Sequence, residues 1–303
     1  MQVLNSFSYA SRVTDPRVGD VMEVVSESWL RQTVSRIAVP RNFTAEPERN
    51  AEIATWIEQQ LQGFGYQTHR QGTYDNIATY PSDAHSSVIL IGAHYDSVPG
   101  TPGADDNGSA VAAMLACAKA VSPFSAELPV CFVAFNREEE GLLGSRDFVT
   151  HFVVPGHMNV REAHILEMVG YRSFQPGSQR LPAGLPIQSP RDAGDFLALV
   201  ANNGARKLPD ELVQCARDYL PEFPVLALKV FLGMERMFPH LLRSDHTPFW
   251  EARIPAMMWT DTAEFRNPHY HQTTDTPDTL DYAFCRQIAQ LLIARVMTSS
   301  TSS

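Results

Sequence analysis

The sequence predicts a single α/β domain with a mostly parallel central sheet and helices on both of its faces. Short segments that are apolar along their whole length, such as residues 87–93 and 129–135, alternate with helical patterns. Such segments are typical of strands covered on both faces of a sheet. The chain contains no internal repeat and no linker that separates two cores, so residues 1–303 are expected to form one domain.

The first half of the chain begins with helical patterns near residues 21–37 and 46–61, and residues 1–45 are expected to form a helical extension. Thr44 is a candidate N-cap of the second helix, and Gly63 is expected to end it. Residues 108–120 are mostly small and apolar, which predicts a helix buried against the sheet. The strands predicted in this half are residues 67–70, 76–80, 87–93 and 129–135.

The second half continues the alternation. Its predicted helices are residues 141–152, 194–202, 210–219, 244–252 and 279–297, and its predicted strands are residues 163–168, 225–230 and 256–260. Residues 172–192 are rich in Pro, Gly and Ser and are expected to form a long surface loop near the functional site.

Composition excludes several classes of function. The chain has 34 acidic residues against 24 Lys plus Arg, a net charge of −10, which argues against nucleic acid as a partner. No segment approaches the roughly 18 consecutive apolar residues of a membrane span. The N-terminus shows no signal-peptide pattern, so the chain as written is expected to be cytoplasmic, although a mature secreted form would look the same. The four cysteines are expected to be buried thiols.

Acidic residues and histidines follow the ends of three predicted strands. His94 and Asp96 follow the first, residues 138–140 are three consecutive glutamates after the second, and Glu167 lies at the end of the third. Function in open α/β sheets lies at the carboxyl ends of the strands. His94 could bind a metal ion while Asp96 orients it through the other ring nitrogen.

Carboxylates also occur side by side in the sequence. Asp105 and Asp106 would repel one another unless a cation lay beside them. In the glutamate triplet, neighbouring side chains point in opposite directions, so one can bind a metal ion while the next faces an activated water. Residues 267–278 add two histidines and two aspartates. Imidazole and carboxylate ligands without a thiolate suit Zn²⁺ and also tolerate Mn²⁺ or Co²⁺.

Five motifs occur in a specific order: HYDS at residues 94–97, GADDNGS at 103–109, EExGLLGS at 138–145, LEMVGY at 166–171 and YHQTTDT at 270–276. In these motifs the chain resembles the zinc aminopeptidases with a co-catalytic metal pair. This family includes glutamate carboxypeptidase and, more distantly, glutaminyl cyclase. The resemblance covers about residues 50–295.

The resemblance implies two zinc ions per chain and a role for each motif residue. His94 and Glu167 would bind one ion, Glu139 and His271 the other, and Asp105 would bridge the two. Glu138 would be the general base, Asp96 would orient His94, and Tyr270 would stabilise the oxyanion. The resemblance also implies a cis peptide bond between Asp105 and Asp106.

Some assignments have alternatives. Many family members have an aspartate at the position of Glu167, which is one methylene longer. Alignment on Gly141 makes Glu138 the base and Glu139 the ligand, whereas a shift by one residue would select Glu139 and Glu140. His269 competes with His271 as a ligand, and the family position favours His271. His246 is expected to lie near the pocket without binding metal.

The resulting expectation is a metal-dependent exopeptidase, an aminopeptidase acting on peptides with a free N-terminus. Residues 230–242 and the 172–192 loop would line an apolar side-chain pocket. One alternative is a carboxypeptidase, which would need an arginine for the substrate carboxylate, with Arg172, Arg180 and Arg243 as candidates. The other two are a glutaminyl cyclase-type acyltransferase with a single zinc ion and a catalytically silent binding domain.

Overall fold

The computed structural model describes residues 1–80 and 86–299. Its central feature, within these residues, is one mixed sheet of nine strands in the order β1-β8-β7-β9-β6-β4-β5-β3-β2. The strands are β1 (Gln2–Asn5), β2 (Thr68–Gln71), β3 (Asn76–Thr79), β4 (Ser87–His94), β5 (Val130–Phe135), β6 (Asn159–Glu167), β7 (Leu197–Ala201), β8 (Val225–Lys229) and β9 (Ala256–Thr260). The middle strands β9, β6, β4 and β5 are mutually parallel, so their carboxyl ends lie at one edge.

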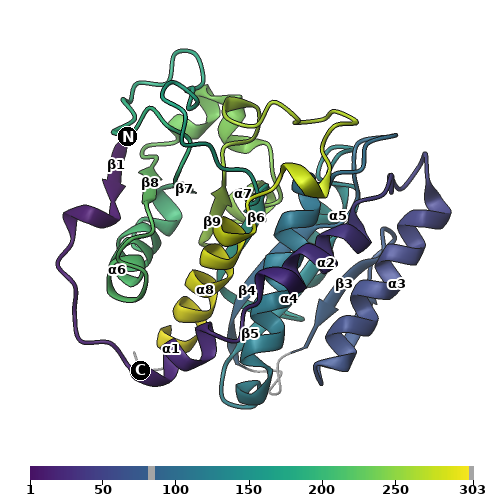
Figure 1. The fold of residues 1–303 in the computed structure, drawn as a ribbon. Helices are drawn as coiled ribbons and strands as arrows, with labels where there is room; N and C mark the ends of the chain where they lie inside the picture. Colours follow the sequence, from purple (N-terminus) through teal and green to yellow (C-terminus); the bar gives the residue numbers. More distant parts are fainter. Residues whose placement is uncertain (81–85, 300–303) are drawn as a thin grey trace.

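Helices cover both faces of the sheet, as the sequence predicts. They are α1 (Pro16–Met22), α2 (Glu27–Ile37), α3 (Pro47–Gly63), α4 (Ala110–Val121), α5 (Leu143–Phe148), α6 (Leu208–Tyr219), α7 (His246–Glu251) and α8 (Tyr282–Ser299). One core lies between the sheet and α1, α2, α3, α4, α6 and α8, and a smaller core lies on the other face against α5 and α7. Figure 1 shows α8 and α4 side by side on the first face.

Helix α4 consists mostly of small apolar residues and lies in the middle of the larger core. Every residue of α4 except Lys119 is buried, and the helix packs against the sheet on one side and against α2 and α8 on the other. A helix with neighbours on several sides needs small side chains for close approach, and Ala supplies them without loss of helix propensity. The buried helix predicted at residues 108–120 is confirmed.

The prediction was wrong for residues 194–202, which contain strand β7 rather than a helix. Leu and Ala favour helices, but the tertiary context overrides this preference. Leu197, Leu199 and Ala201 face the larger core, whereas Val200 faces the smaller one. The alternation fits a strand buried on both faces.

The N-terminal segment contains more than the expected helices. Gln2–Asn5 form β1, which pairs antiparallel with β8 at the edge of the sheet. Four residues are too few for a period-2 pattern to stand out in the sequence. The helical pattern near residues 21–37 is divided between α1 and α2. Within the described part of the chain, no helix combines the length and hydropathy needed to cross a bilayer.

The assignment of β7 predicts the cost of truncating Leu197, whose side chain is fully buried. Leu197→Ala should lower the free energy of unfolding by about 2–5 kcal/mol because it leaves a cavity in the core. Urea denaturation followed by circular dichroism measures this change. Leu232→Ala is the control, since Leu232 is 93% exposed, and it should change the value by no more than about 0.5 kcal/mol. Equal effects of the two substitutions would contradict the burial of β7.

Candidate metal centre

Polar side chains gather where three parallel strands end. β4 ends at His94 and β6 ends at Glu167, while Glu138 and Glu139 lie in the turn after β5. β4 is the middle strand of the three and is parallel to both neighbours. His94 lies opposite Phe135 in the register, which brings the turn after β5 beside the imidazole. Topology alone therefore brings these side chains together from distant parts of the sequence.

The side chains form two groups, each with the size of a metal site. His94, Glu138 and Glu167 form the first, and Asp106, Glu139 and His271 form the second, with the candidate ligand atoms of each group within 4.8 Å of one another. In the first group, His94 Nε2 lies 3.5 Å from Glu167 Oε2 and 3.9 Å from Glu138 Oε2. In the second, His271 Nε2 lies 3.5 Å from Glu139 Oε2.

Asp106 lies between the two groups. One carboxylate oxygen, Oδ1, is 3.5 Å from His94 Nε2, and the other, Oδ2, is 3.2 Å from His271 Nε2. A single carboxylate thus faces both imidazoles, one with each oxygen. This is the arrangement that a carboxylate shared by two cations requires.

Asp105, which the sequence analysis assigned to the shared position, points away from the two groups. Its Oδ1 accepts hydrogen bonds from Ser109 Oγ (2.9 Å) and the Gly170 N–H (2.8 Å), and its Oδ2 accepts one from Asn267 Nδ2 (2.6 Å). Consecutive side chains diverge along the backbone here, so only one of the two aspartates can face the imidazoles. The structure favours Asp106 for the shared position.

The cis peptide bond is also one residue further along than expected. The Asp106–Asn107 bond is cis, and the expectation of a cis bond between Asp105 and Asp106 was wrong. Asn107 Nδ2 donates to the Leu166 carbonyl, and Asn107 Oδ1 accepts from the Met168 N–H. Asn107 therefore connects this segment to the end of β6, where Glu167 lies.

Burial shapes the protonation of the cluster. Desolvation raises the pKa values of Glu138 and Glu139 well above the ordinary range. Desolvation disfavours the charged form of His94, but the carboxylates of Glu138 and Glu167 outweigh it, and the pKa of His94 is raised. For Asp106, contacts with His271 and His94 outweigh burial and lower the pKa. Protons and divalent cations compete for such ligands, so metal binding here would release protons.

Three buried atoms of the candidate ligand residues have no hydrogen-bond partner within the described residues. They are both ring nitrogens of His94 and Oε1 of Glu139. Buried polar atoms are normally paired, so orphaned ones require an explanation. Four carboxylates and two imidazoles, with no thiolate among them, are ligands that Zn²⁺ accepts. The chemistry of the donor set therefore matches the expectation of zinc.

Asp96 contacts both His94 and the turn that carries Glu138 and Glu139, but it is not one of the candidate ligands. Its Oδ1 lies 3.3 Å from His94 Nδ1 and accepts the Glu138 N–H at 3.1 Å, while its Oδ2 accepts the Glu139 N–H at 3.3 Å. The carboxylate is fully buried. Asp96 thus lies beside the imidazole of His94 and accepts two backbone N–H groups of the acidic turn.

Glu140 and the other candidate histidines lie outside both groups. Glu140 accepts hydrogen bonds from Arg137 and from Thr44 Oγ1, which leaves Glu138 and Glu139 as the two members of the glutamate triplet that face the imidazoles. His269 interacts with Thr274 through Nδ1. His246 is buried and donates to the Leu241 carbonyl, and burial lowers its pKa to about 4.

Several residues near the site were not identified from the sequence. Ser244 donates from Oγ to Glu167 Oε2 at 2.7 Å. Asp275 accepts the backbone N–H groups of Asp105 and Asp106 at 2.9 and 3.0 Å. Asp275 belongs to the YHQTTDT motif, so its presence beside the second histidine was the available signal.

Tyr270 lies at the boundary between the cluster and an adjacent cavity. Its ring stacks on His271 with the centroids 3.7 Å apart, and its hydroxyl accepts a hydrogen bond from Arg243. Glu264 also binds Arg243 and fixes the guanidinium. With its oxygen accepting from Arg243, the phenol still carries a proton that it can donate.

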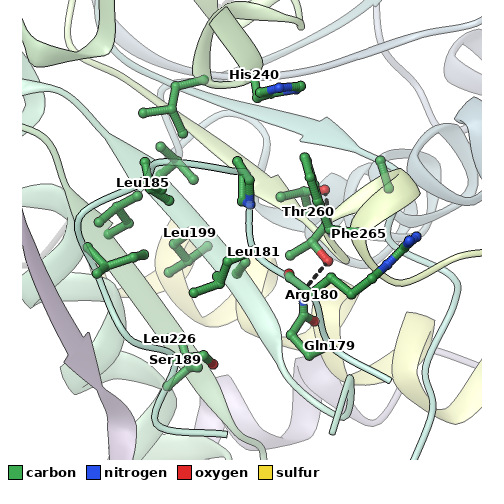
Figure 2. A pocket seen from close by; sticks show the side chains of 18 of the residues that line it. Gln179, Arg180, Leu181, Leu185, Ser189, Leu199, Leu226, His240, Thr260 and Phe265 are labelled. Carbon is green, nitrogen blue, oxygen red and sulfur yellow. Dashed lines mark hydrogen bonds between the residues drawn. The ribbon is translucent and has the colours of Figure 1, made fainter. Parts of the chain in front are cut away.

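An apolar cavity of about 150 Å³ adjoins the cluster. Glu167 and Tyr270 line it together with apolar residues of β7, β8 and β9 and residues of the 172–192 loop. Figure 2 shows Leu181 and Leu185 from this loop near Leu199 and Leu226 from the strands. Leu241, in the segment predicted to line a side-chain pocket, contributes as well. Glu167 thus belongs to both the candidate metal centre and the cavity.

The sequence matches the model of peptidase family M28 over residues 75–189 and 229–296. The chain belongs to peptidase family M28. The resemblance inferred from the five motifs is thereby confirmed, and the matched segments contain all six residues of the two groups.

The chain is similar in sequence to two bacterial proteins, among others. The uncharacterized protein YfbL of Escherichia coli is 33% identical over 242 residues, which cover 75% of this chain and 72% of YfbL. Aminopeptidase YwaD of Bacillus subtilis is 29% identical over 215 residues, which cover 70% of this chain and 41% of YwaD. The chain therefore spans about two fifths of the length of YwaD.

Solved structures with the same fold include a zinc aminopeptidase and a glutaminyl cyclase. LapB from Legionella pneumophila aligns with a TM-score of 0.75 and 23% identity over 97% of this chain and 77% of its own. BSAP, a zinc aminopeptidase from Bacillus subtilis, aligns with a TM-score of 0.54 and 27% identity over 74% of this chain and 49% of its own. A glutaminyl cyclase from Bacteroides thetaiotaomicron aligns with a TM-score of 0.67 and 16% identity over 89% of this chain and 97% of its own.

Proposed function

We propose that the chain is a zinc-dependent aminopeptidase that binds two zinc ions and removes residues from the free N-terminus of peptides. The observation that supports this most strongly is the pair of ligand groups joined by Asp106. Membership of a peptidase family and the likeness to YwaD and BSAP agree with this chemistry.

In this proposal each ion has two ligands of its own and one that is shared. His94 and Glu167 would hold the first ion, Glu139 and His271 would hold the second, and Asp106, rather than Asp105, would be shared between them. The longer side chain of Glu167 reaches this position from the last residue of β6. When bound, the pair of zinc ions would act as Lewis acids toward the scissile carbonyl and lower the pKa of water.

Glu138 is then the carboxylate that remains for proton transfer. Its Oε2 lies 3.9 Å from His94 Nε2, and the side chain is 10% exposed, which leaves it accessible to a substrate that enters the site. Desolvation raises its pKa, which favours a carboxylate that accepts a proton and passes it on. We assign Glu138 as the general base that takes the proton from water and donates it to the leaving amine.

The substrate is positioned by groups on either side of the first ligand group. The carboxylates of Glu138 and Glu167 would bind the α-amine, and the apolar cavity next to Glu167 would take the side chain of the N-terminal residue. This favours apolar residues at the N-terminus. Tyr270 would donate its hydroxyl proton to the carbonyl oxygen as negative charge develops there.

Removal of C-terminal residues is less well supported because the candidate arginines already have partners. Arg243 binds Glu264 and Tyr270, Arg180 donates to the Glu264 carbonyl, and Arg172 binds Asp281. A carboxypeptidase would need one of these guanidinium groups for the substrate carboxylate.

A glutaminyl cyclase activity remains the second candidate, since the fold is shared with a solved cyclase. A cyclase with a single zinc ion needs only one of the two ligand groups that converge here. Release of ammonia from an N-terminal glutaminyl peptide, without hydrolysis of other peptides, would favour it. A silent binding domain would not need to retain both groups.

Glu138→Gln should fold and bind close to two zinc equivalents but lose hydrolysis of leucine anilide by several orders of magnitude, because the amide cannot accept the proton. Turnover and metal content measured on the same preparation test this. Glu140→Gln is the matched control, since Glu140 lies outside both groups, and it should keep near-normal turnover. Normal turnover of Glu138→Gln would show that another residue is the base.

Asp106→Asn and Asp105→Asn should have opposite phenotypes. Asp106→Asn should lose at least one zinc equivalent, because an amide is a poor bridge between two cations. Asp105→Asn should keep both ions but lose about 1–3 kcal/mol of stability, since its amide nitrogen would face the donors around it. Metal analysis and urea denaturation of both variants separate the two roles. Loss of zinc from Asp105→Asn alone would restore the original assignment of Asp105.

Asp96→Asn should weaken zinc binding or turnover about 10-fold to 100-fold, since the residue no longer fixes the orientation of His94 and the acidic turn. Competition with a chelator of known affinity measures the change. Unaltered zinc affinity together with unaltered turnover would exclude an orienting role for Asp96.

A further inference from the structure

Arg41 is a fully buried arginine in the segment between α2 and α3, before the part of the chain that matches the family model. Within the described residues it forms no ion pair with a carboxylate at contact distance. Its guanidinium instead donates to backbone carbonyls. Burial of a charged group without an ion-pair partner lowers stability. An arginine at such a position therefore suggests that its planar set of N–H donors is needed there.

Three of the four carbonyls that Arg41 binds lie at the two ends of one loop, and the fourth belongs to Val39. Nε donates to the Tyr95 carbonyl at 2.6 Å, Nη1 donates to the Pro102 carbonyl at 2.5 Å, and Nη2 donates to the Gly103 carbonyl at 2.9 Å. Tyr95 directly follows His94, and Gly103 lies three residues before Asp106. The planar guanidinium therefore joins the segment that bears His94 to the segment that bears Asp106.

The backbone around Arg41 adds further contacts to the same loop. The Arg41 N–H donates to Ser97 Oγ at 3.1 Å, and Asn42 Nδ2 donates to the Ser97 carbonyl at 3.0 Å. The Arg41 carbonyl in turn accepts from Asn50 Nδ2 of α3 at 2.8 Å. Arg41 is thus itself fixed in place.

Close packing leaves the loop little freedom where Arg41 binds it. Gly103 has φ +59°, and a Cβ at this position would lie 2.3 Å from the Asp106 carbonyl oxygen and 3.1 Å from Arg41 Nη1. Burial lowers the pKa of Arg41 to about 10, so the side chain is protonated at neutral pH. The carboxylates of Asp96, Asp275, Asp106 and Glu139 favour the charged form from a distance.

We propose that Arg41 is a positioning residue that sets the spacing of His94 and Asp106 and thereby the affinity of the metal centre. This inference rests on the proposed function, because it concerns the same two ligand groups. It assigns a role in the site to an N-terminal segment that supplies no ligand.

The direction in which zinc affinity changes when Arg41 is removed distinguishes a positioning role from a purely electrostatic one. A positive charge near the site repels a divalent cation, so if charge alone mattered, its removal would tighten zinc binding. If Arg41 positions the ligands, its removal weakens zinc binding. A role confined to folding would lower the stability of the metal-free protein and leave the zinc affinity of the folded protein unchanged.

Zinc dissociation constants of the full chain, measured by competition with a chelator, test the proposal. Arg41→Met should weaken binding about 10-fold to 100-fold, the range seen when residues that orient metal ligands are lost. Arg41→Lys retains the charge but cannot reach both ends of the loop, and it should also bind zinc less tightly than the wild type. Hydrogen exchange of amides 95–106 in the metal-free protein should accelerate in both variants.

Arg295→Met is the matched control for the loss of a buried arginine. Arg295 binds Glu162 near the amino end of β6, at 2.7 Å, and its side chain is 12% exposed. Its loss should reduce the melting temperature without changing the zinc affinity. If Arg41→Met does not fold, Arg41→Lys and Gly103→Ala provide the test, since the added Cβ would displace the same loop and should weaken zinc binding.

Unchanged or tighter zinc binding by the folded Arg41 variants, with the wild type binding two ions, would overturn the role of Arg41. A wild-type protein that binds no zinc would instead overturn the proposed function. The two failures are therefore distinguishable in one series of titrations.

Discussion

The rest of the structure depends on the convergence of four carboxylates and two imidazoles at the carboxyl edge of the parallel strands. Like charges this close repel where water is scarce, so a fold that brings Glu138 within 4.8 Å of Glu167 and Asp106 within 4.8 Å of Glu139 must fix these side chains by other means. The means are visible around the cluster. Parallel strands set the positions of the backbone, and buried side chains bind the segments between the ligands.

The acidic residues around the site fall into two sets. Asp106, Glu138, Glu139 and Glu167 face the imidazoles, whereas Asp96, Asp105 and Asp275 accept backbone N–H groups that hold the ligand-bearing segments. The Asp105–Asp106 pair contains one residue of each kind. The two adjacent carboxylates therefore have different roles: Asp106 is a candidate ligand, and Asp105 holds the backbone near the site. Arg41, in the N-terminal segment, also binds the backbone of the ligand-bearing segments.

Much of this could be predicted from the sequence, because strand ends and motif order are local features. The apolar strands and the acidic residues after them identified the edge of the sheet, and the motif order identified the family. The choice between Asp105 and Asp106 was not available, since it depends on an unusual backbone path through Asp106 (φ −100°, ψ 87°) and Asn107. β7 was mistaken for a helix because Leu and Ala do not distinguish the two structures when both faces are buried. Arg41 gave no signal, because three of its four carbonyl partners lie more than fifty residues away.

The central claim is that this cluster binds two cations on either side of Asp106. Anomalous diffraction at the zinc absorption edge, from crystals of the wild-type protein grown with zinc, tests it most directly. The account predicts two peaks about 3.5–4 Å apart, one beside His94 and Glu167 and the other beside Glu139 and His271. A single peak, or peaks only at surface residues, would contradict it.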